Sequence, residues 1–136
     1  MTDIENAKKI FNDENYPAVF CRGDEIIKIT ENGLKPLVEL AESGKDLFNF
    51  SVCDKVTGRA AAFLYVLLGV KEVHATVMAK LAIQILDRAE IKYSANTFAD
   101  EILNKDKTAP DIFEEAVLRS GSAIKALEDI KMALRK

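Results

Sequence analysis

The hydrophobic and polar positions of this chain follow two different periods. Residues 1–16 carry apolar side chains at helical spacing and are predicted to form a short amphipathic helix or an arm, which Pro17 ends. The runs Ala18–Cys21 and Glu25–Ile29 are typical of strands, and Gly23-Asp24 between them suits a tight turn. The chain is therefore expected to open with a helical segment followed by a β-hairpin.

Helical and strand-like patterns alternate through the rest of the chain, which is expected to form one domain over residues 1–136. An alternation of this kind after a hairpin predicts an α/β fold, a three-layer α/β/α domain with a mixed sheet. The expected strands are Phe48–Val52, Lys71–Val77 and Ile91–Ala95. The expected helices lie between Leu34 and Gly44, over Asp54–Leu68, around Leu81–Ala89, from Thr97 to Leu103, from Thr108 to Val117 and over 122–136.

The last of these helices, residues 122–136, is amphipathic. It should place Ile124, Leu127, Ile130 and Leu134 on one side, while its other side is charged. A homo-oligomer would use this helix as its contact surface.

The central segment, Asp54–Leu68, has the most unusual pattern. A polar opening from Cys53 to Arg59 leads into Ala60–Val70, which is apolar on every face. A helix of that kind belongs in the middle of a domain, so its N-terminus carries polar groups out of the core. The apolar run is shorter than the roughly 20 residues that span a bilayer, so we expect a buried helix and no membrane partner.

Four residues at this opening are candidates for binding a ligand. Asp54 is the natural N-cap of the helix. The charge of Lys55 opposes the helix dipole, which is tolerated if the side chain reaches a carboxylate or a bound anion. Gly58 costs about 1 kcal/mol inside a helix relative to alanine, which suggests a close approach, either of another backbone or of a ligand. Thr57 flanks the same turn.

Cys53 has two interpretations. If it precedes a helix N-terminus, the helix dipole and Lys55 would lower its pKa and make the thiol reactive. Alternatively, it packs as a small hydrophobic residue, because no histidine lies nearby in the sequence to act as a base. Cys53, Asp54 and Lys55 are therefore the candidate catalytic residues.

Composition and charge narrow the classes of function. The 136 residues include 49% hydrophobic and 30% charged side chains, with a net charge of −3, as in ordinary globular proteins. No basic stripe with interleaved aromatic residues is present, which argues against nucleic acid as a partner. The N-terminus lacks the pattern of a signal peptide, so we expect a cytoplasmic protein whose two cysteines stay reduced.

Four segments resemble a small prokaryotic family of unknown function with a cytidine-deaminase-like fold. They are Ala18–Ile29, Cys53–Ala62, Lys71–Ala75 and Glu114–Leu118, and the resemblance covers roughly residues 15 to 120. The most specific part is the Asp-Lys-Val-x-Gly-x-Ala-Ala run that begins at Asp54. The resemblance implies a five-stranded mixed sheet flanked by helices.

The chain departs from the zinc-binding motifs of true deaminases with this fold. In those enzymes a His/Cys-x-Glu motif opens the helix that corresponds to Asp54 onward, and Pro-Cys-x-x-Cys opens the next. Here the first helix is expected to open with Cys53-Asp54-Lys55, and the second with 77–81, which has no cysteine. The family's Cys-Pro pair before the late helix is also absent, since 107–111 holds only the proline.

The remaining soft metal ligands are scattered. Cys21, Cys53 and His74 lack the close pairing typical of structural zinc sites. We therefore expect no metal, no cofactor and no zinc-dependent deamination, and we expect His74 to lie in a small polar niche on its strand.

Three hypotheses follow for function. The protein binds a small anionic or nucleotide-like ligand at the N-terminus of the central helix through Asp54, Lys55, Thr57 and Gly58. Alternatively, it is a metal-independent enzyme that uses Cys53 or the Asp54/Lys55 pair, or it is a structural or oligomerisation module. The polar loop Asn104–Asp106 is either a solvated connection or a border of the same cleft.

Overall fold

The computed structural model describes residues 1–104, 106 and 111–135. Helix α1 (Asp3–Glu14) precedes the hairpin of β1 (Ala18–Arg22) and β2 (Glu25–Ile29), and α2 (Lys35–Glu42) follows. The next elements are β3 (Ser51–Thr57), α3 (Arg59–Leu68), β4 (Glu72–Ala79), α4 (Ala82–Arg88) and β5 (Lys92–Ala99). The chain closes with α5 (Ile112–Ala116) and α6 (Ala123–Leu134).

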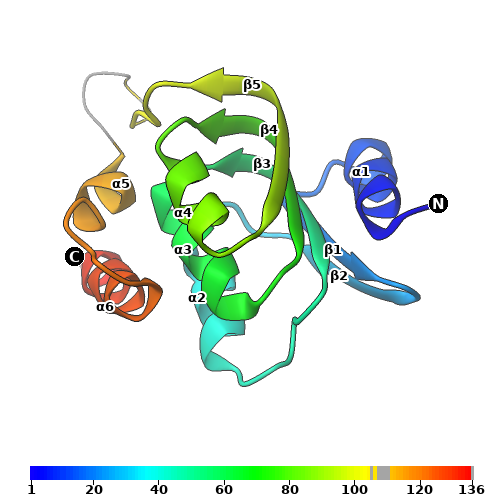
Figure 1. The fold of residues 1–136 in the computed structure, drawn as a ribbon, viewed down its shortest axis with the longest axis horizontal. Coiled ribbons are helices and arrows are strands. Elements are labelled where there is room, and N and C mark those ends of the chain that lie inside the picture. The colour runs from blue at the N-terminus through cyan, green and yellow to red at the C-terminus, as the bar shows by residue number, and fades with distance from the viewer. Residues whose placement is uncertain (105, 107–110, 136) are drawn as a thin grey trace.

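The five strands form one mixed sheet in the order β2-β1-β3-β4-β5. Strand β1 runs antiparallel to both β2 and β3, whereas β3, β4 and β5 are parallel to one another. Figure 1 shows α1 on one face of the sheet and α2, α3 and α4 on the other, with α6 packed on α3. This is the α/β architecture, a mixed five-stranded sheet flanked by helices, that the sequence pattern and the resemblance predict.

The main core lies between the sheet and α3. Six of the ten residues of α3 are buried, among them Leu64 and Tyr65, because the sheet, α2, α4 and α6 surround this helix. Gly69 ends it in the left-handed conformation at a φ of +77°, a position that glycine adopts without strain. The prediction of a buried central helix is confirmed.

The predicted start of α3, however, is wrong. Strand β3 continues through Thr57, and the helix begins at Arg59 with Gly58 as its N-cap, so Asp54 and Lys55 are strand residues. The physical reason is that β1 and β4 offer hydrogen-bonding partners on both sides of β3, and Val56 and Thr57 are β-branched residues that favour a strand.

Two further predictions need correction. No helix begins at Thr97, because β5 extends to Ala99 and Thr97 pairs with Val77 of β4. In α6 the buried residues are Ala126 and Ile130, whereas Ile124 is 68% exposed. The expected opening of the late helix at Thr108 and Pro110, and Lys105 of the polar loop, lie outside the described residues.

Candidate functional site

Asp54 is a buried carboxylate on the face of β3 that packs against α3. It is 8% exposed, and its Oδ2 atom accepts hydrogen bonds from the hydroxyls of Tyr65, at 2.6 Å, and Thr57, at 2.8 Å. Both partners follow from the local fold. Thr57 is the last residue of β3, and its hydroxyl reaches back to Asp54, three residues earlier in the same strand. Tyr65 reaches Asp54 from the second turn of α3.

The environment of Asp54 favours its neutral form. Burial raises the pKa of this carboxyl to about 6, while the hydrogen bonds from Tyr65 and Thr57 and two backbone amides act in the opposite direction. In the part of the chain that the structure describes, none of the groups that shift this pKa is a positive charge. The carboxylate is therefore stabilised by hydrogen bonds from hydroxyls and amides, and not by a salt bridge.

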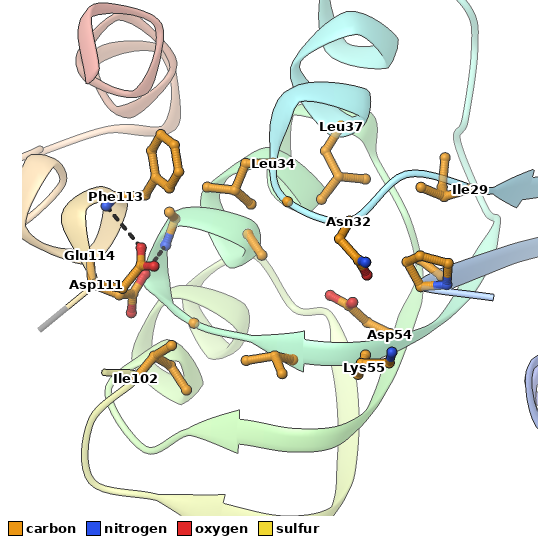
Figure 2. A pocket seen from close by; sticks show the side chains of 17 residues that line it. Ile29, Asn32, Leu34, Leu37, Asp54, Lys55, Ile102, Asp111, Phe113 and Glu114 are labelled. Atoms are coloured by element: carbon orange, nitrogen blue, oxygen red, sulfur yellow. Dashed lines mark hydrogen bonds between the residues drawn. The ribbon is translucent and has the colours of Figure 1, made fainter. Parts of the chain in front are cut away.

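A cavity of about 240 Å³ opens beside Asp54. It lies between the segment before α2, the start of α3, and α5 (Figure 2). Its walls are mostly apolar, from Ile29, Leu34, Leu37, Ile102 and Phe113. The polar side chains that line it are those of Asn32, Asp54, Lys55, Asp111 and Glu114. In Figure 2 the Asp54 carboxylate turns toward the amide of Asn32.

Glu114 is the residue at this site that sequence reasoning missed. Its carboxylate accepts hydrogen bonds from the backbone amides of Arg59, at 2.8 Å, and Ala60, at 2.9 Å, and so caps α3 from 54 residues away. Such a carboxylate satisfies amides that have no partner within the helix, and it also suits the helix dipole. The one available signal was the resemblance over Glu114–Leu118, which gave the residue no role.

Glu114 also explains Gly58. A Cβ atom placed on Gly58 would lie 2.5 Å from Oε1 of Glu114, closer than any tolerable contact. The close approach at Gly58 is therefore made by a side chain of the protein, and not by the backbone or the ligand that the sequence suggests. The position at the N-terminus of α3 where the sequence predicts an anionic ligand is occupied by the carboxylate of Glu114.

The four predicted ligand-binding residues are partly brought together. Asp54, Lys55 and Gly58 line the cavity, whereas Thr57 contributes through its hydrogen bond to Asp54. Lys55 is exposed and forms no ion pair with any residue that the structure describes. The carboxylate partner proposed for Lys55 is thus not found among those residues.

Cys53 lies on the opposite face of the sheet from the cavity. It is buried beneath α1 in a small cluster with Ala7, Phe11, Val19 and Cys21. Burial raises the pKa of its thiol to about 12, and the charge of Asp54 adds to that effect. The expectation of a lowered pKa is therefore wrong, because Cys53 sits within a strand and not at a helix N-terminus, and it packs as a small hydrophobic residue.

His74 occupies the polar niche predicted for it. Its Nδ1 lies 2.7 Å from the Ser94 hydroxyl and its Nε2 lies 3.0 Å from Oδ1 of Asn96. Burial is the main cause that lowers its pKa. Within residues 1–104, 106 and 111–135, no group of three or more histidine, cysteine, aspartate or glutamate side chains is placed to hold a metal ion.

The fold and the cavity define a class: an α/β protein with a mixed sheet and a small, apolar-walled site at the end of its central strand. Residues 6–134 match the family described as a domain of unknown function, DUF1893, so the chain belongs to that family. A crystal structure of a DUF1893 family protein from Thermotoga maritima matches with a TM-score of 0.87 and 26% identity, covering 97% of this chain and 90% of that one. No curated protein matches the chain. Among the described helices, none has the length and apolar character needed to cross a bilayer.

Proposed function

We propose that this protein binds a small molecule in the cavity between α2, α3 and α5, with Asp54 as its polar anchor. The observation that carries the proposal is a carboxylate, only 8% exposed, at the wall of a cavity with apolar sides. Binding sites for small molecules are typically concave and apolar, with a few polar groups that orient the ligand. At about 240 Å³ the cavity lies below the usual range for drug-sized ligands, which favours a compound the size of a single ring.

The sequence predicts an anionic or nucleotide-like ligand at the start of the central helix. The amides of Arg59 and Ala60 that would hold such an anion are engaged by Glu114. A phosphate or carboxylate ligand would therefore have to displace Glu114 to reach them. A ligand that contacts Asp54 needs no such displacement.

A metal-independent enzyme is the second candidate, now through Asp54 alone. Cys53 faces away from the cavity, whereas burial raises the pKa of Asp54 to about 6. A carboxyl with a pKa close to neutral exchanges protons effectively with a bound substrate. The third hypothesis, a structural or oligomerisation module built on α6, stays a prediction.

For the fold itself we propose a cytidine-deaminase-like arrangement without the zinc site. The mixed five-stranded sheet with a buried helix after β3 supports this proposal. The helices open at Arg59 and Ala82, and neither opening contains a histidine or cysteine. The departure from the deaminase motifs therefore also holds at the helix starts of the structure.

Ligand-observed NMR with single-ring fragments of each charge type tests the binding proposal. Leu34→Trp places a large side chain at the cavity wall, whereas Ile26→Trp adds the same side chain on the exposed hairpin. We expect fragments that bind wild type and Ile26→Trp but not Leu34→Trp. If every fragment is inactive, or if Leu34→Trp binds as well as wild type, the proposal is wrong.

A further inference from the structure

Most of the charged side chains around the cavity are acidic. Three carboxyl residues line it, Asp54, Asp111 and Glu114, whereas Lys55 is the one basic residue among its described lining, and it is exposed. A ligand carrying negative charge would meet three acids and one solvated ammonium. A positive charge would meet these acids beside apolar walls that weaken screening by water, although Glu114 already has the Arg59 guanidinium at 3.9 Å.

The roles of these acids in the fold point to Asp54 as the group that would meet a ligand. Asp111 accepts from the amide of Phe113 at 2.9 Å and caps α5, and Glu114 is held by the amides at the start of α3. Asp54 caps no helix, although its Oδ2 atom accepts from two hydroxyls and two backbone amides also hydrogen-bond its carboxylate. Its carboxylate is turned into the cavity toward Asn32, whose side-chain oxygen is a second acceptor (Figure 2).

The body of the ligand is constrained by the apolar side chains. Leu34, Leu37 and Phe113 form a wall opposite β3, with the Phe113 ring at the end near Glu114 (Figure 2). An aromatic ring attracts a cation placed over its face and also packs against flat apolar groups. The site thus combines acceptors on one side with an aromatic and aliphatic surface on the other.

We infer that the ligand is a small organic cation: an ammonium, amidinium or guanidinium group on a flat apolar body the size of one ring. This inference rests on the proposed function and adds the charge and donor pattern of the ligand to it. An amidinium N–H donated to the Asp54 carboxylate forms a charge-assisted hydrogen bond, which is stronger than a bond between two neutral groups. A bound cation would also supply the positive charge that Asp54 lacks.

The test is a set of three compounds that differ only in charge: benzamidine, benzamide and benzoate, measured by thermal shift and by NMR titration of the labelled protein. Benzamidine at ten times its dissociation constant should raise the melting temperature by about 4 °C. It should shift amide signals around Asp54 and Phe113. Benzamide and benzoate should bind at least tenfold more weakly, since each lacks the charge-assisted bond to Asp54.

Variants separate the outcomes. Asp54→Asn keeps the shape of the side chain and should weaken benzamidine roughly tenfold to a hundredfold, whereas Asp24→Asn, an exposed turn residue, should not. Unchanged benzamidine affinity in Asp54→Asn overturns the inference. If benzoate or benzamide binds more tightly than benzamidine, and this binding is lost in Leu34→Trp, the inference of a cationic ligand is wrong. The proposed binding function is then retained. If none of the three binds and the wider fragment panel is also inactive, both proposals fail. The comparison of the three compounds uses the wild-type protein, so it does not depend on whether any variant folds.

Discussion

Replacing Glu114 with alanine should destabilise the protein sharply, because it removes the cap of the central helix. The carboxylate accepts from two backbone amides, a part-buried one at 2.8 Å and a buried one at 2.9 Å. A hydrogen bond to a charged group contributes about 1.5–3 kcal/mol, and a donor left buried without a partner costs about 1–3 kcal/mol. Water entering through the adjacent cavity can solvate these amides, which places the loss near the low end for each. We therefore expect about 3 kcal/mol in total, or roughly 10 °C in melting temperature.

Chemical denaturation of matched variants measures this loss. Glu115→Ala removes the same side chain from the next, exposed position of α5 and should cost less than about 0.5 kcal/mol. Glu114→Gln keeps one acceptor oxygen and should fall between the two. Sulfate should stabilise Glu114→Ala more than wild type, since the opened N-terminus of α3 is then available to an anion. If Glu114→Ala is no less stable than Glu115→Ala, the carboxylate does not cap α3.

Three further predictions concern neighbouring residues. Gly58→Ala should cost about 1–3 kcal/mol in wild type and much less in Glu114→Ala, because the added Cβ would lie 2.5 Å from Oε1 of Glu114; equal costs in both backgrounds would contradict that contact. For Asp54, the folded pKa of about 6 lies above the ordinary 3.8, so the native state binds the extra proton and this residue lowers stability as pH rises from about 4 to 6, by roughly 3 kcal/mol in all. Asp54→Asn should lack that component in unfolding curves measured between pH 4 and 7, and a difference between the two proteins that does not change with pH would refute it. Cys53, with its pKa raised to about 12, should resist iodoacetamide at neutral pH in the native state and react only on unfolding, as mass spectrometry would show.

Elements marked by a strong local signal could be predicted from the sequence. The β1–β2 hairpin is one example, since Gly23 and Asp24 form its turn and Arg22 pairs with Glu25. The buried α3 is another, since its apolar character on all sides requires partners on all sides. The start of α3 was misplaced by five residues because Asp54 and Lys55 are typical of a helix N-terminus when neighbours along the chain are considered alone. Pairing with β1 and β4 decides the matter, and those strands are distant in sequence.

The candidate site could be predicted only in part, for the same reason. The abrupt change from polar to apolar residues after Gly58 marks the edge of the core, and the structure has Asp54, Lys55 and Gly58 in the wall of a cavity there. The partners that define its chemistry were not predicted, because Glu114 meets Arg59 across 55 residues. Nothing in local spacing distinguishes Glu114 from the exposed Glu115 beside it. The assignment requires the packing of α5 against α3.

The buried carboxylate of Asp54 lowers the stability of the protein, and the fold does not need a carboxylate at this position. A carboxylate buried without a cation is less favourable at neutral pH than a neutral side chain of the same shape, and asparagine in that place could still accept from Tyr65 and Thr57. Glu114 and Asp111, by contrast, each cap a helix and so stabilise the structure they belong to. Residues that reduce stability while facing a cavity are where a protein gives up stability for binding or catalysis. Of the three acids at this site, Asp54 is therefore the one that we propose meets a ligand, whereas the other two cap the helices around the cavity.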